Sequence, residues 1–340
     1  MIPYQTIRSV HLEISSLCNA RCPLCPRNLY GYPYNSGYTE NNLTLKDIQT
    51  IFTPDFLGQL SSVHMIGNFG DFIMNPESLE IVQYFSNTNP ELHMFVGSNA
   101  SARDQDFWSE LAKVKNLKFE FCIDGLADTH HLYRQNTSWD TIINNAKTFI
   151  NAGGNAKWKF IKFKHNQHQI QQCEQLANTL GFSEFEVYDE GRNTGPVFDK
   201  QGNYLHALGD YTGETDITKV LEQASTGMML LEDLSQQNSP KTTVSCKAKN
   251  NQSIFISSTG DVSPCCWLGI DPKTYGKGRY HEPCNKQVAP MIQKNNVFEH
   301  SLQECLEWFA DVEKSWKIES YQDGRLLICD DYCGSNECAQ

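Results

Sequence analysis

The sequence predicts an α/β fold in its first 190 residues, followed by a smaller cysteine-bearing region, in a chain of 340 residues. Two observations carry this prediction. Up to about residue 190, short apolar runs alternate with longer amphipathic ones, which is typical of βα units with parallel strands. Beyond that point the alternation stops, and cysteines recur from Cys246 onward. The length is also sufficient for about two domains.

Six strands and five helices are predicted in the first part. Turn and capping residues mark several boundaries: Thr44 and Asp47 have the spacing of a capping box, and Gly181 is placed to end a helix. In folds with this βα order, functional residues gather at the carboxyl ends of the strands. The predicted strands are 8–14, 62–66, 92–96, 117–123, 157–163 and 184–188, and the predicted helices are 44–52, 76–85, 104–114, 139–152 and 167–180.

Composition predicts a soluble cytoplasmic enzyme. The chain opens without a basic segment followed by an apolar stretch, so no secretion signal is predicted, and no run is long enough to span a membrane. Its 13 cysteines are therefore expected to be reduced thiols available for metals rather than a disulfide scaffold. A net charge of −12 argues against sequence-independent binding of nucleic acid.

Three cysteines follow the first predicted strand. Cys18, Cys22 and Cys25 have C-x3-C-x2-C spacing. An iron–sulfur cube takes four ligands, so a compact trio leaves one iron open to bind something else. A zinc ion with a distant fourth ligand is the alternative interpretation. The motif resembles the signature of the radical S-adenosylmethionine (SAM) enzymes.

This resemblance implies both a fold and a reaction. The fold is a partial (β/α)6 TIM-like barrel, an open relative of the (β/α)8 barrel. The cofactors are a [4Fe-4S] cluster with an open iron and SAM, whose amino and carboxylate groups the open iron chelates. SAM is then cleaved reductively to a 5′-deoxyadenosyl radical that abstracts hydrogen from a substrate carbon. An external electron donor, flavodoxin-like or ferredoxin-like, is implied as a partner.

The resemblance also implies SAM contacts after successive strands. The run 67–71 occupies the place of the family's Gly-Gly-Glu element, although Phe69 and Asp71 depart from it, and Cys122 stands where a Ser-x-Asp-Gly motif has serine. Arg134 corresponds to an arginine that pairs with the SAM carboxylate; an exposed helix charge is the alternative. Turn formation alone is the alternative for the Gly- and Asn-containing runs. The implied contacts are Leu24 (adenine), Phe69, Gly70, Asp71, Ser98, Asn99, Cys122, Asp124 and Arg134.

The second half contains another cysteine pattern. Cys246 and Cys265 fit C-x13-G-x4-C, and Cys329, Cys333 and Cys338 fit C-x3-C-x4-C. The arrangement resembles the SPASM and twitch auxiliary-cluster domains. It implies one auxiliary [4Fe-4S] cluster held by Cys246, Cys265, Cys329 and Cys333, with Cys338 as a substitute for either tail ligand. A structural zinc site is the alternative.

Three regions are therefore predicted: a barrel over 1–190, a connecting segment over 191–245 that is loop-rich over 191–213 and contains a helix within 216–234, and a twitch/SPASM-like auxiliary domain over 246–340. The predicted function is that of a radical SAM oxidoreductase or maturase acting on a peptide or protein residue. The alternatives are a dehydrogenase of a small metabolite and a zinc- or cluster-stabilised interaction protein without catalysis. Substrate identity and oligomeric state do not follow from the sequence.

Overall fold

The computed structural model describes residues 2–33, 39–189, 194–226, 242–269 and 287–336. The chain divides into two compact units. One unit comprises Glu13–Asn35 and Glu40–Leu221, and the other comprises Met1–Leu12, Ser36–Thr39 and Glu222–Gln340. We call them the barrel unit and the terminal unit. The first twelve residues thus group with the carboxy-terminal part, and the predicted boundaries at 190 and 245 remain predictions.

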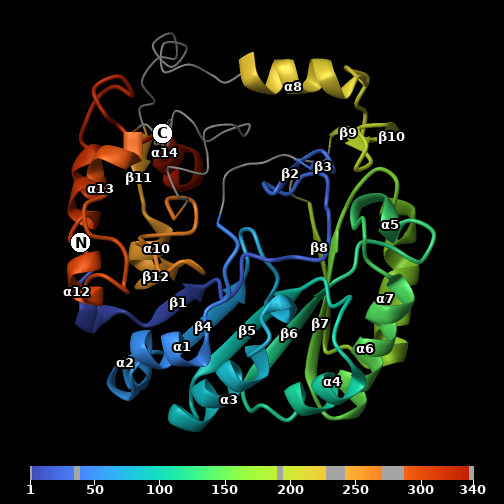
Figure 1. The fold of residues 1–340 in the computed structure, drawn as a ribbon, viewed down its shortest axis with the longest axis horizontal. Coiled ribbons are helices and arrows are strands. Elements are labelled where there is room, and N and C mark those ends of the chain that lie inside the picture. Colours follow the sequence, from blue (N-terminus) through green and yellow to red (C-terminus); the bar gives the residue numbers. More distant parts are fainter. Residues whose placement is uncertain (1, 34–38, 190–193, 227–241, 270–286, 337–340) are drawn as a thin grey trace. The chain divides into compact units, whose positions relative to one another are not determined.

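The barrel unit contains a parallel sheet whose strands follow one another in chain order, as the βα pattern predicts (Figure 1). Two of the predicted strand ranges, 62–66 and 184–188, match the structure at both ends. The strands are β4 (Ser62–Ile66), β5 (His93–Ser98), β6 (Leu117–Cys122), β7 (Asn155–Ile161) and β8 (Glu184–Tyr188).

Helices alternate with these strands along the chain. The capping box of α1 (Leu45–Ile51) is present, since the Thr44 hydroxyl accepts from the Asp47 N–H and the Asp47 carboxylate accepts from the Thr44 N–H. Gly181 ends α7 (Ile170–Leu180) with φ 87°. Two short helices, α2 (Pro54–Gln59) and α5 (His130–Tyr133), were not predicted. The remaining helices of the βα units are α2 (Pro54–Gln59), α3 (Ser78–Thr88), α4 (Gln105–Leu111), α5 (His130–Tyr133), α6 (Trp139–Asn151) and α7 (Ile170–Leu180).

An aromatic core fixes the orientation of β6. Phe119 and Phe121 are fully buried and pack against Trp108 of α4 and Phe149 of α6, with ring centroids 5.1 Å (Trp108–Phe119) and 5.8 Å (Phe121–Phe149) apart. Each such side chain contributes about 1.5–3 kcal/mol through burial. Because side chains alternate along a strand, Glu120 and Cys122 point to the opposite face of the sheet, away from α4 and α6.

The segment after residue 190 contains more structure than the sequence predicted. The loop-rich interpretation of 191–213 was wrong in part, because β9 (Gly195–Phe198) and β10 (Tyr204–Leu208) form an antiparallel hairpin. Asp199, Gly202 and Asn203 form the hairpin turn, where Asp199 accepts from the N–H groups of Gln201 and Asn203. The helix predicted within 216–234 is present as α8 (Ile217–Thr226), and its remainder lies outside the described residues.

In the terminal unit, β1 (Ser9–Leu12) pairs in parallel with β12 (Ser253–Ile256), and β12 pairs antiparallel with β13 (Val262–Ser263). The β12–β13 hairpin turns at Thr259-Gly260-Asp261, where the Gly260 N–H donates to the Ser257 carbonyl. β11 (Thr242–Val244) pairs antiparallel with β14 (Gly334–Asn336). The helices of this unit are α10 (Lys247–Asn250), α12 (Leu302–Cys305), α13 (Phe309–Ser315) and α14 (Leu327–Cys333). Among the described residues of either unit, no helix combines the length and apolar character of a membrane span.

Candidate functional site

The three amino-terminal cysteines lie on a loop that is held by its own backbone and by polar side chains. The Cys25 N–H donates to the Cys22 carbonyl at 3.0 Å, which closes a turn between these two residues. Arg27 donates to the Cys18 carbonyl at 3.0 Å, and Asn28 donates to the Cys22 carbonyl at 3.1 Å. All three thiols are free, and burial raises the pKa of each. These thiols must lose their protons when they bind a metal.

The loop that follows β4 is fixed by a carboxylate that the sequence analysis missed. Glu13 is 2% exposed, and its Oε1 accepts the N–H groups of Phe69 at 2.6 Å and Gly70 at 2.9 Å. Burial raises the pKa of Glu13 to about 7. A Cβ on Gly70 would lie 1.8 Å from the Ser15 carbonyl oxygen, so only glycine fits this close approach. Two predicted SAM contacts, Phe69 and Gly70, are thus held through their backbone.

Asp71 joins this loop to the end of β5. Its carboxylate accepts the Ser98 hydroxyl at 2.5 Å, the Asn99 N–H at 2.8 Å and the Asn99 side-chain amide at 2.7 Å. The Asn99 amide nitrogen also lies 3.7 Å from the Cys18 sulfur. Asp71, predicted as a direct SAM contact, is 7% exposed and orients Ser98 and Asn99 next to the cysteine loop.

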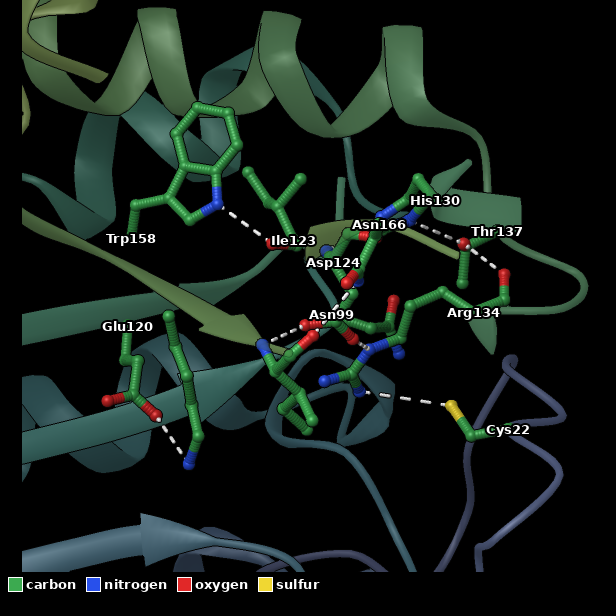
Figure 2. Close-up of polar contacts among 12 residues, drawn as sticks. Cys22, Asn99, Glu120, Ile123, Asp124, His130, Arg134, Thr137, Trp158 and Asn166 are labelled. Atoms are coloured by element: carbon green, nitrogen blue, oxygen red, sulfur yellow. Dashed lines mark hydrogen bonds and ion pairs between the residues drawn. The ribbon is translucent and has the colours of Figure 1, made fainter. Parts of the chain in front are cut away.

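Asp124 and Arg134 form a buried ion pair after β6 (Figure 2). The Arg134 Nε donates to Asp124 Oδ2 at 2.5 Å, and the Ile161 N–H donates to Asp124 Oδ1 at 2.7 Å. Burial would lower the pKa of Arg134, but Asp124 and Cys22 raise it well above its ordinary value. The Arg134 Nη1 also lies 3.8 Å from the Cys22 sulfur. The alternative interpretation of Arg134 as an exposed helix charge is therefore wrong.

A neutral histidine supports this ion pair, and it too was missed. The Asp124 N–H donates to Nδ1 of His130 at 3.1 Å, so the ring proton is on Nε2, which is 3.1 Å from the Thr137 hydroxyl. That hydroxyl donates to the Arg134 carbonyl at 2.6 Å (Figure 2). Burial lowers the pKa of His130 to about 3, so the ring stays neutral. Asn166 adds a further donor to the Asp124 carbonyl at 3.2 Å.

The two remaining predicted SAM contacts lie beside this group. Leu24 is partly buried and packs against an apolar cluster that includes Tyr133 and Phe163. Cys122 is on the sheet face opposite the helices, and burial raises the pKa of its thiol to about 12. Hydrogen bonds thus link Cys18 and Cys22 to Asn99, Asp71 and Arg134, at the carboxyl ends of neighbouring strands.

The terminal unit contains a second cysteine site. A cavity of about 230 Å³ is lined by five cysteines together with Trp267, Tyr332 and apolar side chains. The rings of Trp267 and Tyr332 stack with centroids 3.8 Å apart. All four preferred auxiliary ligands line this cavity, and Cys266 is the fifth cysteine; Cys338 lies outside the described residues. The cysteines are Cys246, Cys265, Cys266, Cys329 and Cys333.

A buried arginine fixes the helix that carries two of these cysteines. Arg325 Nη2 lies 2.6 Å from Asp330 Oδ1 on α14, and Nη1 of Arg325 donates to the Trp316 carbonyl at 2.6 Å.

In the part of the chain that the structure describes, no three His, Cys, Asp or Glu side chains are placed to hold a single metal ion.

Comparison with known proteins gives matches at the level of structure. No protein-family model and no curated protein matches the sequence. Among solved structures, Streptococcus suis SuiB bound to S-adenosylmethionine is similar with a TM-score of 0.58 and 15% identity, over 95% of this chain and 77% of that chain. The radical SAM fold is common to this structure and the others that follow. The chain has the fold of the radical SAM enzymes.

Two further structures with the radical SAM fold contain peptides. SuiB bound to the precursor peptide SuiA is similar with a TM-score of 0.56 and 16% identity, over 94% of this chain and 67% of that chain. Native anSMEcpe with bound AdoMet and Cp18Cys peptide has a TM-score of 0.54 and 13% identity, over 97% and 91% of the two chains. The predicted fold class, a partial barrel followed by an auxiliary domain, is confirmed.

Proposed function

We propose that this protein is a radical SAM enzyme that abstracts hydrogen from a carbon of a peptide or protein residue. When bound, a [4Fe-4S] cluster with one open iron supplies the electron that cleaves SAM into methionine and a 5′-deoxyadenosyl radical. Cys18, Cys22 and Cys25 hold that cluster. A flavodoxin-like or ferredoxin-like protein is the proposed source of the electron.

The observation that carries this proposal is the set of N–H donors directed at the cysteine sulfurs. Asn99 directs its amide toward Cys18, and Arg134 directs its guanidinium toward Cys22. Hydrogen bonds to a sulfur favour its thiolate form, so these donors suit Cys18 and Cys22 as cluster ligands. Both donors are themselves fixed by buried carboxylates, Asp71 and Asp124.

The residues around the cysteine loop have separate roles in binding SAM. Arg134 has five N–H groups in a planar fork, and Nη2 makes no hydrogen bond within the described residues, so it is available to a carboxylate. Glu13 holds the backbone of residues 69 and 70, whose carbonyls are the acceptors we assign to the SAM ammonium group. The apolar surface of Leu24 is assigned to adenine.

The cavity in the terminal unit suits an auxiliary [4Fe-4S] cluster. It holds several times the volume of a water molecule, which is about 30 Å³ in the liquid. We assign Cys246, Cys265, Cys329 and Cys333 as its ligands. The role we assign to this cluster is to accept an electron from the substrate. A peptide substrate is supported by the peptides in the SuiA and Cp18Cys complexes of the two similar proteins.

The test is anaerobic reconstitution with iron, sulfide, SAM and dithionite, followed by measurement of 5′-deoxyadenosine. We expect the Cys18→Ala/Cys22→Ala/Cys25→Ala variant to lose SAM cleavage while keeping the auxiliary iron. The matched variant Cys265→Ala is expected to lose the auxiliary iron and to keep SAM cleavage. Full cleavage by the triple variant, or a wild type that binds zinc and no iron, contradicts the proposal.

A further inference from the structure

The sheet face opposite the helices carries a row of charged side chains on β6, β7 and β8. Trp158 and Phe121 point to the helix side, where they contact Phe182 near the end of α7. The alternating residues Glu120, Lys157 and Lys159 therefore point to the other side, and they are only 12–19% exposed. This charged row is not used by the cluster or SAM contacts assigned above.

The two lysines on β7 differ in the number of carboxylates that contact their ammonium groups. Lys157 contacts three carboxylates: Nζ lies 3.2 Å from Glu120 and 3.6 Å from Glu184, and it also pairs with Glu186. The Tyr188 hydroxyl is a further partner at 3.2 Å. The ammonium group of Lys157 is thus saturated by partners within the protein.

Lys159, two residues farther along the same face, pairs with one carboxylate among the residues that the structure describes. Its Nζ is 3.4 Å from Oε1 of Glu120, an ion pair at the long end of the hydrogen-bond range. The same ammonium lies 4.2 Å above the Tyr188 ring, a cation–π contact. An ammonium group has three donors, so Lys159 retains donors for a further anion.

Lys159 lies beside the ion pair at the end of β6. It is opposite Cys122 in the β6–β7 register, and it precedes by two residues Ile161, whose N–H binds Asp124. Burial lowers the pKa of Lys159, but the neighbouring Cys122 and Glu120 raise it overall, so the side chain stays charged. A cation with free donors therefore lies next to Asp124 and Arg134.

We propose that Lys159 is a specificity-determining residue that binds a carboxylate of the substrate, with the Tyr188 ring and Glu120 holding its ammonium in place. The inference deepens the proposed function and rests on it. The carboxylate belongs to an aspartate or glutamate side chain or to the carboxyl terminus of a peptide, since both present the same group to the ammonium.

The experiment measures peptide binding to the reconstituted protein with SAM by equilibrium dialysis. The probes are a capped pentapeptide with a central glutamate between alanines, its glutamine counterpart, and an all-alanine pentapeptide with a free or an amidated carboxyl terminus. We expect the wild type to prefer one carboxylate peptide over its neutral counterpart by about tenfold or more, as for a charge-assisted hydrogen bond. Which pair shows the preference identifies the source of the carboxylate.

Three variants separate recognition from folding. Lys159→Gln is expected to lose the preference, and Lys159→Arg to retain it. Lys157→Gln is the matched control on the same strand and face, and it is expected to retain the preference. Equal binding within both peptide pairs by the wild type, including no binding of any peptide, overturns the inference, as does a preference that survives in Lys159→Gln.

Measurement of SAM cleavage on the same preparations distinguishes the two proposals. A wild type that cleaves SAM without preferring a carboxylate contradicts only the role of Lys159. A reconstituted wild type that does not cleave SAM contradicts the proposed function itself.

Discussion

Replacing Asp124 by asparagine tests whether the buried ion pair with Arg134 organises the site. Asparagine keeps the size of the side chain and an oxygen for the Ile161 N–H, but it removes the negative charge from a side chain that is 0% exposed. At an effective dielectric constant of 20, two charges 4 Å apart interact by about 4 kcal/mol. Removing one partner of a buried pair costs about 3–5 kcal/mol. We therefore expect the free energy of unfolding to fall by about 3–5 kcal/mol.

The assay is urea unfolding of the metal-free protein, followed by circular dichroism, on the wild type, Asp124→Asn, Arg134→Met and the double variant. If the cost comes from an uncompensated buried charge, the double variant will be more stable than the sum of the single changes predicts. Additive effects, or a loss below about 1 kcal/mol in Asp124→Asn, would refute the reasoning; losses of that size are typical of exposed pairs. In such a case the contacts of Arg134 other than the Asp124 pair would be sufficient to hold it.

Two further predictions concern the loop after β4. Gly70→Ala is expected to lower the free energy of unfolding by about 1–3 kcal/mol or more, because the new Cβ meets the backbone of Ser15. The control is Gly58→Ala in α2, where the new Cβ has no atom within 4 Å, so this change is expected to be neutral or stabilising. Equal urea midpoints for the two variants would contradict this prediction. For Glu13, the pKa rises from 4.5 to about 7 on folding, so the wild type loses stability as pH rises through this window. This pKa difference corresponds to about 3 kcal/mol. Between pH 4.5 and 8 the free energy of unfolding of the wild type should therefore fall by about 3 kcal/mol relative to that of Glu13→Gln. Parallel curves of stability against pH for the two proteins would contradict this prediction.

The strands and helices of the barrel unit were largely predictable because burial repeats with the period of each element. In the ranges 62–66 and 184–188 apolar and polar residues alternate between flanking turn residues, and the structure reproduces both ranges without a shift. The β9–β10 hairpin was missed because its apolar stretches are only four or five residues long, and its turn residues dominate the composition. The short helix α5 was missed because four residues give no amphipathic period.

In the site, the residues that follow strands were predictable, while those that support them were not. Cys18, Asn99 and Arg134 stand in motifs with fixed spacing, so the sequence located them. Glu13 and His130 act on backbone N–H groups of other segments, and those partners are known only once the chain is folded. The one available signal for Glu13 was a carboxylate in the apolar run that ends at Ile14, since a buried charge requires donors.

Two buried carboxylates hold different segments at the strand ends. Glu13 binds the backbone of the loop that follows β4. The shorter side chain of Asp71 instead accepts from Ser98 and Asn99 at the end of the next strand. Asn99 thereby directs its amide at the Cys18 sulfur, so a charge kept inside the protein positions a hydrogen-bond donor next to the cysteine loop.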